Sequence, residues 1–214
     1  MDQPRTVAVL VGRPATHTSV RGNEVRTAFR KTVVDGPVAL RWTNIDGDEQ
    51  ADLRVHGGVD KAVLAYSAEH SQAWRAIDPE LGEPGAFGEN LHVSGLTEAD
   101  VCIGDRWAVG SALFEISQPR QPCWKVEHRW RSDGLVARME ETGRTGWYLR
   151  VVTPGVVGAG DGIDADIVDV MIGGLTAGLA ADRHPAATEV PARNEHSAQH
   201  VRRRSAIGRQ RQCQ

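Results

Sequence analysis

The chain has 214 residues, of which 40% are apolar and 25% charged, and its formal net charge is −3. These values are typical of a globular protein that is long enough to bury a substantial core. The three cysteines, at positions 102, 123 and 213, share no short spacing. This argues against a disulfide scaffold and a structural zinc site, and it favours a reducing cytoplasm.

Charge is distributed unevenly along the chain. The last 44 residues contain seven arginines and three acidic residues, which leaves 18 basic and 25 acidic residues in the first 170. A net acidic body argues against an extended nucleic-acid-binding surface, although a local basic cluster can still bind a small anion. The apolar run near the N-terminus is too short for a secretory signal, and no stretch is long enough to span a membrane.

Short apolar and alternating runs predict strands through most of the first 170 residues. They cover 6–11, 25–31, 38–42, 62–66, 106–109, 112–117, 147–152, 156–157 and 163–170. Gly110-Ser111 predicts a tight hairpin between two of them. Many short strands with few helices predict a mainly β (α+β) fold, namely a closed or partly closed β-barrel that removes exposed strand edges.

Two short helices are predicted from their capping residues. The first covers 67–77 and has Ser67 as its N-cap. The second covers 134–141, with Ser132 as its N-cap and Gly143 at the C′ position.

The composition changes near residue 171, where large apolar residues almost disappear. We therefore expect one domain over 5–170 and a largely disordered Ala/Arg-rich tail over 171–214, with a short helix near 175–181. Cys213 would then be an incidental exposed thiol.

Cys123 is the best candidate for a reacting atom. It follows Pro119 and Pro122, and because each proline fixes its own φ and favours extended geometry before it, the thiol is expected on a stiff loop. Arg120 would favour the thiolate if its guanidinium folds back toward the sulfur. The alternative is that Cys123 is a small buried apolar residue, as free cysteines often are.

Two neighbouring loops concentrate charge. The acidic run at 46–52 superficially resembles a calcium loop, but it lacks the full spacing and the terminal glutamate, which favours a solvated turn with Asx-type bonds. The next loop combines Arg54, His56 and Lys61 with paired glycines that can expose backbone N–H groups. Such a loop suits a phosphate or another oxyanion, and the alternative is a glycine turn with a surface ion pair.

Residues 87–91 form a polar loop that enters a strand. Asn90 can hydrogen-bond a heterocycle there, and Glu89 can act as an acid or a base. The alternative is a plain turn, in which glycine and asparagine are favoured anyway.

Three further features are expected to be structural. The aromatic side chains of the run 142–148 are expected to pack in the barrel. His70 is expected on a helix surface, and Cys102 in the core.

Five segments acquire a meaning when they are taken together: Gly47-Asp48-Glu49-Gln50-Ala51-Asp52, His56-Gly57-Gly58-Val59-Asp60-Lys61-Ala62-Val63, Phe87-Gly88-Glu89-Asn90-Leu91, Ser117-Gln118-Pro119-Arg120-Gln121-Pro122-Cys123 and Thr142-Gly143-Arg144-Thr145-Gly146-Trp147. In this order and spacing they resemble the MOSC family, the domain homologous to the C-terminal part of molybdenum-cofactor sulfurases, and within it the YiiM-like bacterial branch. Residues 25–31 also resemble the early strand of that branch. The match covers about 5–170 and is more specific than any one motif.

The resemblance implies a MOSC-type β-barrel that binds the molybdenum cofactor, a pterin dithiolene that carries a phosphate. It implies Cys123 as the molybdenum or sulfur ligand, and a thiolate is a soft ligand suited to such a centre. Arg120 would contact an anion or stabilise the thiolate. Pyridoxal phosphate is not expected, because the lyase domain of the sulfurases is absent from this chain.

The resemblance also implies five further cofactor-binding residues. Lys31, His56 and Lys61 would neutralise the phosphate or the pterin periphery. Asp60 would orient Lys61, and Asn90 would hydrogen-bond the pterin.

Members of this branch are associated with the reductive detoxification of N-hydroxylated nucleobase analogues. The resemblance therefore implies an oxidoreductase that reduces N-hydroxylated small molecules and releases the oxygen as water. The chain has no Gly-x-Gly-x-x-Gly fingerprint for a flavin or nicotinamide, so a separate electron-donor protein is expected.

Two alternatives use the same cysteine. One is a sulfur-carrier or cofactor-maturation protein with a persulfide on Cys123, and the other is a non-catalytic module that binds or stores the cofactor. A cysteine hydrolase that pairs Cys123 with His56 has less support, because neither the order nor the spacing establishes their contact.

The chain departs from this branch after the barrel, where relatives continue into a small helical module. Residues 171–214 lack the apolar spacing that such a module needs. A homodimer is compatible with the family, but electron transfer or dimer contacts that depend on this module are in question here.

Overall fold

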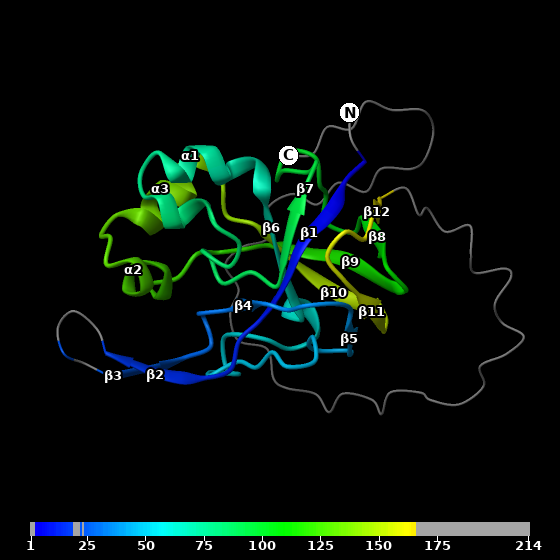
Figure 1. Cartoon of the computed structure of the whole chain (residues 1–214), viewed down its shortest axis with the longest axis horizontal. Coiled ribbons are helices and arrows are strands. Elements are labelled where there is room, and N and C mark those ends of the chain that lie inside the picture. Colours follow the sequence, from blue (N-terminus) through cyan, green and yellow to red (C-terminus); the bar gives the residue numbers. More distant parts are fainter. Residues whose placement is uncertain (1–2, 19–21, 23, 166–214) are drawn as a thin grey trace, which may run out of the picture. The chain divides into compact units, whose positions relative to one another are not determined.

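Most regular elements of the protein are β-strands. A computed structural model of the chain describes residues 3–18, 22 and 24–165 (Figure 1). Eight strands form one sheet in the order β12-β8-β9-β10-β6-β7-β1-β4, in which only the β6 and β7 neighbours are parallel. These strands are β1 (Arg5–Val11), β4 (Thr32–Val33), β6 (Val63–Ser67), β7 (Leu91–Ser94), β8 (Arg106–Val109), β9 (Ala112–Pro119), β10 (Trp147–Thr153) and β12 (Ile163–Asp164). Two smaller pairs are β2 (Ala15–Thr18) with β3 (Glu24–Thr27), and β5 (Val38–Leu40) with β11 (Gly155–Val157).

The large sheet curls so that the start of β1 reaches the chain before β12. Arg5 forms an isolated antiparallel bridge with Gly162. Thr6 donates its N–H to the Asp161 carbonyl at 2.8 Å and accepts the Gly160 N–H at 2.7 Å. These bonds satisfy backbone groups that would otherwise form an open edge. The predicted mainly β fold is therefore confirmed, in the form of a partly closed barrel.

Inward-facing side chains fill the barrel. Along β9 the buried residues Ala112, Phe114 and Ile116 alternate with more exposed ones, as expected for a strand that turns one face to a core. Trp107 and Trp147 meet edge to face, with 5.8 Å between their ring centroids. Apolar burial inside the strands thus provides the rigid frame from which the loops extend.

Three short helices lie close together (Figure 1) and contribute side chains to a second apolar cluster. They are α1 (Ser71–Arg75), α2 (Lys125–Trp130) and α3 (Leu135–Thr142), with 3-10 turns at Val59–Lys61, Ala68–His70 and Pro79–Gly82. Phe87 and Val126 belong to this cluster and are almost completely buried. The cluster therefore anchors the loop before β7, in which Phe87 lies, and the first turn of α2, in which Val126 lies.

Several local predictions are confirmed. Ser67 caps the turn that precedes α1 by accepting the Glu69 N–H. Gly143 ends α3 in the left-handed region, with a φ of 67°, where a side chain would be strained. The strands β8 and β9 form the predicted hairpin around Gly110-Ser111.

The strand predicted over 25–31 is too long, because β3 ends at Thr27. The Thr27 hydroxyl accepts the Phe29 N–H at 3.1 Å, so a local side-chain bond replaces the strand ladder there. The short strand β2, which pairs with β3, was not predicted.

The prediction that Ser132 caps α3 is wrong. The Glu127 carboxylate accepts the N–H groups of Gly134 and Val136 at 2.9 and 3.2 Å. A side chain of α2 therefore binds main-chain N–H groups that have no partner inside the first turn of α3. Cys102 is also not a core residue, because it is half-buried in the turn before β8.

Two polar residues, His70 and Glu89, are more buried than predicted. The ring of His70 is mostly buried and lies 2.6 Å from Glu98, so it is not a surface residue. Glu89 is completely buried, and its carboxylate accepts the N–H groups of Gly85 and Phe87 at 2.6 and 3.1 Å. Glu89 thus braces its own loop, which replaces the predicted role as an acid or base.

The predictions for the tail over 171–214, the helix near 175–181, the domain boundary at residue 170 and Cys213 lie outside the described residues. The strand predicted over 163–170 begins as β12. Among the helices of the described residues, none has the length and apolar character needed to cross a membrane.

We expect Ile163→Ala to destabilise the protein by about 2–5 kcal/mol, because truncation of a buried aliphatic side chain leaves a cavity. Ile163 on β12 is 2% exposed and belongs to the barrel core. Val156→Ala is a suitable control, since Val156 on β11 is 44% exposed. Urea denaturation measures both variants, and equal losses would contradict the role of β12 in the core.

Candidate functional site

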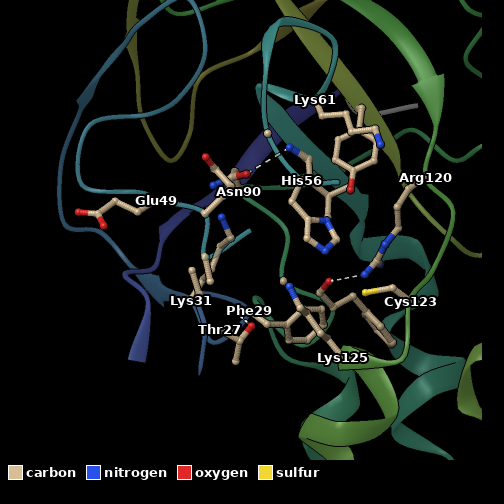
Figure 2. Close-up of a pocket in the computed structure, with 18 of the residues that line it drawn as sticks. Thr27, Phe29, Lys31, Glu49, His56, Lys61, Asn90, Arg120, Cys123 and Lys125 are labelled. Atoms are coloured by element: carbon tan, nitrogen blue, oxygen red, sulfur yellow. Dashed lines mark hydrogen bonds between the residues drawn. The ribbon is translucent and has the colours of Figure 1, made fainter. Parts of the chain in front are cut away.

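A pocket opens where four loops meet near the barrel. Its walls come from 27–31, 49–57, 87–90 and 120–125, together with residues of β6 and β10 and the turn before β6. It contains about 650 Å³ of space free of protein atoms, counting the open mouth. Six of the seven predicted site residues line this pocket (Figure 2): Lys31, His56, Lys61, Asn90, Arg120 and Cys123.

Cys123 lies in the loop between β9 and α2, directly before the helix. It is a free thiol in a half-buried residue, and its carbonyl accepts the Val126 N–H at 3.0 Å. In Figure 2 the sulfur and the guanidinium of Arg120 lie on the same wall of the pocket. The thiol therefore lies at the wall of an open pocket and not in the apolar core, while its role as a metal ligand stays a prediction.

Arg120 carries a buried positive charge. The residue is 5% exposed, and its guanidinium donates to the carbonyls of Phe87 at 3.0 Å and Thr145 at 3.4 Å. Within the described part of the chain, no carboxylate pairs with it. Because a buried charge costs free energy unless an opposite charge offsets it, Arg120 is available to an anionic group in the pocket.

Other nitrogen-bearing side chains extend the positive character of the pocket. Lys61 donates to the Val55 carbonyl at 3.2 Å, and Lys125 lines the pocket near the thiol. Burial, followed by the charges of Lys125 and Lys61, lowers the pKa of His56 from 6.5. The imidazole of His56 is therefore neutral near pH 7 and can donate or accept a hydrogen bond.

Lys31 differs from these groups because a carboxylate already neutralises it. Its Nζ lies 2.6 and 2.7 Å from the two oxygens of Asp48, which also accepts the Gly12 N–H at 2.7 Å. Burial lowers the pKa of Lys31, and the Asp48 charge opposes this shift. The arrangement favours a structural role for Lys31 at the pocket wall over the predicted contact with a phosphate.

Asp60 is the one predicted site residue that does not line the pocket, and it does not orient Lys61. Its carboxylate lies 2.6 Å from Arg150 on β10, and its main-chain carbonyl accepts the Ser117 hydroxyl. Asp60 therefore fastens the turn before β6 to the neighbouring strands, because its charge finds a closer partner on the outer face of β10.

Asn90 lies buried at the pocket wall, just before β7. Its Oδ1 accepts the Leu64 N–H at 3.2 Å, and its Nδ2 donates to the Leu10 carbonyl at 3.1 Å. The amide thus connects β6 with β1 across the start of β7. The hydrogen bond from Asn90 to a pterin stays a prediction.

Three aspartates of the acidic run at 46–52 form ion pairs. Asp52 pairs with Arg54 at 2.9 Å and also accepts the Arg54 N–H, as expected for an Asx-type turn. Asp46 pairs with Arg41, and Asp48 pairs with Lys31. Among the described residues, no group of three His, Cys, Asp or Glu side chains could hold a metal ion.

Tyr148 lines the pocket, although its ring was expected to pack inside the barrel. Trp147 does pack in the barrel, but successive strand residues point to opposite faces, so Tyr148 turns to the pocket. Burial raises the pKa of Tyr148, and its phenol therefore stays protonated and can donate a hydrogen bond. Lys125 also lines the pocket and was not predicted as a site residue. Its position two residues after Cys123 could have indicated it.

Known proteins share this architecture. A family model of the MOSC domain matches residues 52–164. The uncharacterized protein YflK of Bacillus subtilis strain 168 is 41% identical over 154 residues, which cover 72% of this chain and 69% of YflK. Protein YiiM of Escherichia coli strain K12 is 42% identical over 136 residues, or 62% of this chain and 61% of YiiM. A protein named reductase from Gibberella moniliformis is 40% identical over 146 residues, or 66% of this chain and 26% of that protein.

The fold comparison agrees with the sequence comparison. The crystal structure of YiiM from Geobacillus stearothermophilus superposes with a TM-score of 0.61 and 36% identity, covering 75% of this chain and 73% of that one. The chain therefore belongs to the MOSC domain family, and it resembles the YiiM proteins within it. It spans about three fifths of the E. coli protein and about a quarter of the fungal reductase.

We expect Asp48→Ala to destabilise the protein by about 3–5 kcal/mol, because it leaves Lys31 buried without its partner and the Gly12 N–H without its acceptor. Asp46→Ala removes an exposed partner from the same acidic run and should leave the unfolding midpoint unchanged. Chemical denaturation distinguishes the two, and a neutral Asp48→Ala would show that the buried pair is dispensable.

Sulfate binding should reveal the titration of His56. Because the pKa of His56 is lowered below 6.5, the ring gains its charge only at acid pH, and the pocket then becomes more positive. We expect sulfate affinity, measured by calorimetry, to rise as the pH falls below about 6.5. His56→Asn should flatten this rise, and an unchanged profile would exclude His56 from the anion site.

Proposed function

We propose that this pocket binds the molybdenum cofactor and that the protein reduces N-hydroxylated small molecules with electrons from a separate donor protein. The MOSC domain is generally associated with this cofactor, and one similar protein is named a reductase. The observation that carries the proposal is Arg120, a buried cation on the same pocket wall as a free thiol, without a carboxylate partner among the described residues.

The side chains of the pocket suit the chemistry of this cofactor, which combines a sulfur-rich metal centre with an anionic phosphate. The Cys123 thiolate is a soft ligand that would hold molybdenum. Arg120, Lys61 and Lys125 would offset the negative charge of the bound group. The neutral His56 would hydrogen-bond its polar periphery.

When bound, the cofactor supplies the redox chemistry, and the protein supplies binding and orientation. Reduction of an N-hydroxyl group to the amine consumes two electrons and two protons and releases water. Phe29 offers an apolar face for a planar substrate, and the protonated hydroxyl of Tyr148 offers a hydrogen bond to the departing oxygen. The electrons would come from a partner protein, since the sequence carries no fingerprint for a flavin or nicotinamide.

The first test is the metal and pterin content of the protein. Full-length protein from a host that makes the cofactor should contain nearly stoichiometric molybdenum, and Cys123→Ala should lose most of it while keeping the wild-type circular dichroism spectrum. The physical reason is the loss of the soft ligand. Elemental analysis and pterin fluorescence measure the change, and equal contents in both proteins would remove Cys123 from the metal site.

The same preparation separates the other candidate functions. Bound molybdenum with turnover of a hydroxylamine supports the reductase, and bound molybdenum without turnover supports a storage module. A persulfide on Cys123 without metal would instead support a sulfur carrier. Peptide mass spectrometry identifies that persulfide directly.

Lys61→Ala should lower cofactor occupancy severalfold without unfolding the protein, because it removes one positive charge from a half-buried pocket wall. Arg41→Ala is a matched control, since Arg41 is an exposed cation that pairs with Asp46. Pterin content and the thermal midpoint are the two readouts. Wild-type occupancy in the Lys61 variant would take this lysine out of the site.

A further inference from the structure

Two chain segments hold Arg120: the segment just before β10 and the loop that carries Phe87. The main-chain N–H of Arg120 donates to the Gly146 carbonyl at 3.0 Å, and its guanidinium donates to the Thr145 carbonyl at 3.4 Å. The remaining guanidinium bond goes to Phe87. The direction of the guanidinium therefore depends on the Phe87 carbonyl and on where residues 145–146 place their carbonyl groups.

Residues 144–146 are themselves held by side chains from outside the pocket. The Glu98 carboxylate accepts the Gly146 N–H at 2.7 Å with one oxygen and lies 2.6 Å from the His70 ring with the other. The Tyr66 hydroxyl donates to the Arg144 carbonyl at 3.0 Å. Neither Glu98 nor His70 lines the pocket.

The position of Gly146 requires a glycine, and the Glu98 carboxylate holds its main-chain N–H in place. Its φ is +79°, and a Cβ there would lie 2.5 Å from the Ala65 carbonyl, so only glycine fits. Glu98 is held in its ionised form, because burial raises its pKa but the bonds from His70 and Gly146 lower it by more. A charged acceptor thus fixes the Gly146 N–H, on the same residue whose carbonyl accepts the Arg120 N–H.

We propose that the His70–Glu98 pair is a positioning device for Arg120. The pair fixes Gly146, Gly146 and Thr145 fix Arg120, and Arg120 presents its charge beside Cys123. This inference rests on the anion-binding role proposed above for Arg120, but not on the identity of the anion or on the redox reaction.

The test uses the charge that Arg120 presents to reagents that attack Cys123. Full-length protein is made in a host that cannot synthesise the cofactor, and Cys123 is alkylated with anionic iodoacetate or neutral iodoacetamide. Peptide mass spectrometry gives the rate at Cys123 alone. The ratio of the two rates measures the local positive charge, and general changes in thiol exposure cancel in it.

Arg120→Ala calibrates this ratio and should lower it about fivefold, as expected for the loss of one nearby charge in water. Glu98→Ala should lower the ratio about threefold, because Arg120 stays in the chain but loses its fixed direction. Glu98→Gln keeps an acceptor for the Gly146 N–H and should restore a value near that of wild type. Glu69→Ala is the matched control, since Glu69 accepts the Gly95 N–H at 2.8 Å but does not touch 144–146.

A folded Glu98→Ala protein with the wild-type ratio would overturn the positioning role and leave the proposed role of Arg120 intact. A wild-type ratio in Arg120→Ala would overturn both the positioning role of the His70–Glu98 pair and the proposed anion-binding role of Arg120. If Glu98→Ala does not fold, Glu98→Asp replaces it, because the shorter side chain keeps the charge but cannot reach both His70 and Gly146. A lowered ratio in that variant supports the inference, and a wild-type ratio rejects it.

Discussion

Arg120 is buried against main-chain carbonyls, and no carboxylate of the described residues neutralises it. Carbonyl dipoles can orient a guanidinium, but they do not cancel its charge. Glu49 is the acid that lines the pocket with Arg120, Lys61 and Lys125, while Lys31 is neutralised by its own aspartate. The pocket therefore favours an anionic ligand through its net charge, before any specific contact is considered.

Such a pocket needs loops that hold their shape, and buried carboxylates supply much of the support. Glu89 binds two N–H groups of its own loop, Asp48 binds the Gly12 N–H and Lys31, and Glu98 binds the Gly146 N–H and His70. Each acid satisfies a main-chain donor that the strand ladders leave unpaired. The acidic residues near the pocket thus act mainly on the backbone, and the positive groups are left to face the ligand.

The family match and the contacts of Arg120 are two independent reasons to expect an anionic ligand in the pocket. The MOSC match and the likeness to YiiM proteins establish the family and the fold, and the MOSC domain is in general associated with the molybdenum cofactor. The contacts around Arg120 give a reason, independent of that association, for an anion beside the Cys123 thiol.

Periodicity, turn chemistry and proline geometry were enough to predict most barrel strands, the hairpin at Gly110-Ser111 and the loop that carries Cys123. The charges that stay available in the pocket could be identified only in the folded chain. Asp60 turns to Arg150 instead of Lys61, and Tyr148 faces the pocket while its neighbour Trp147 fills the barrel. These outcomes depend on partners that lie far away in the sequence, and no local pattern specifies the distances between them.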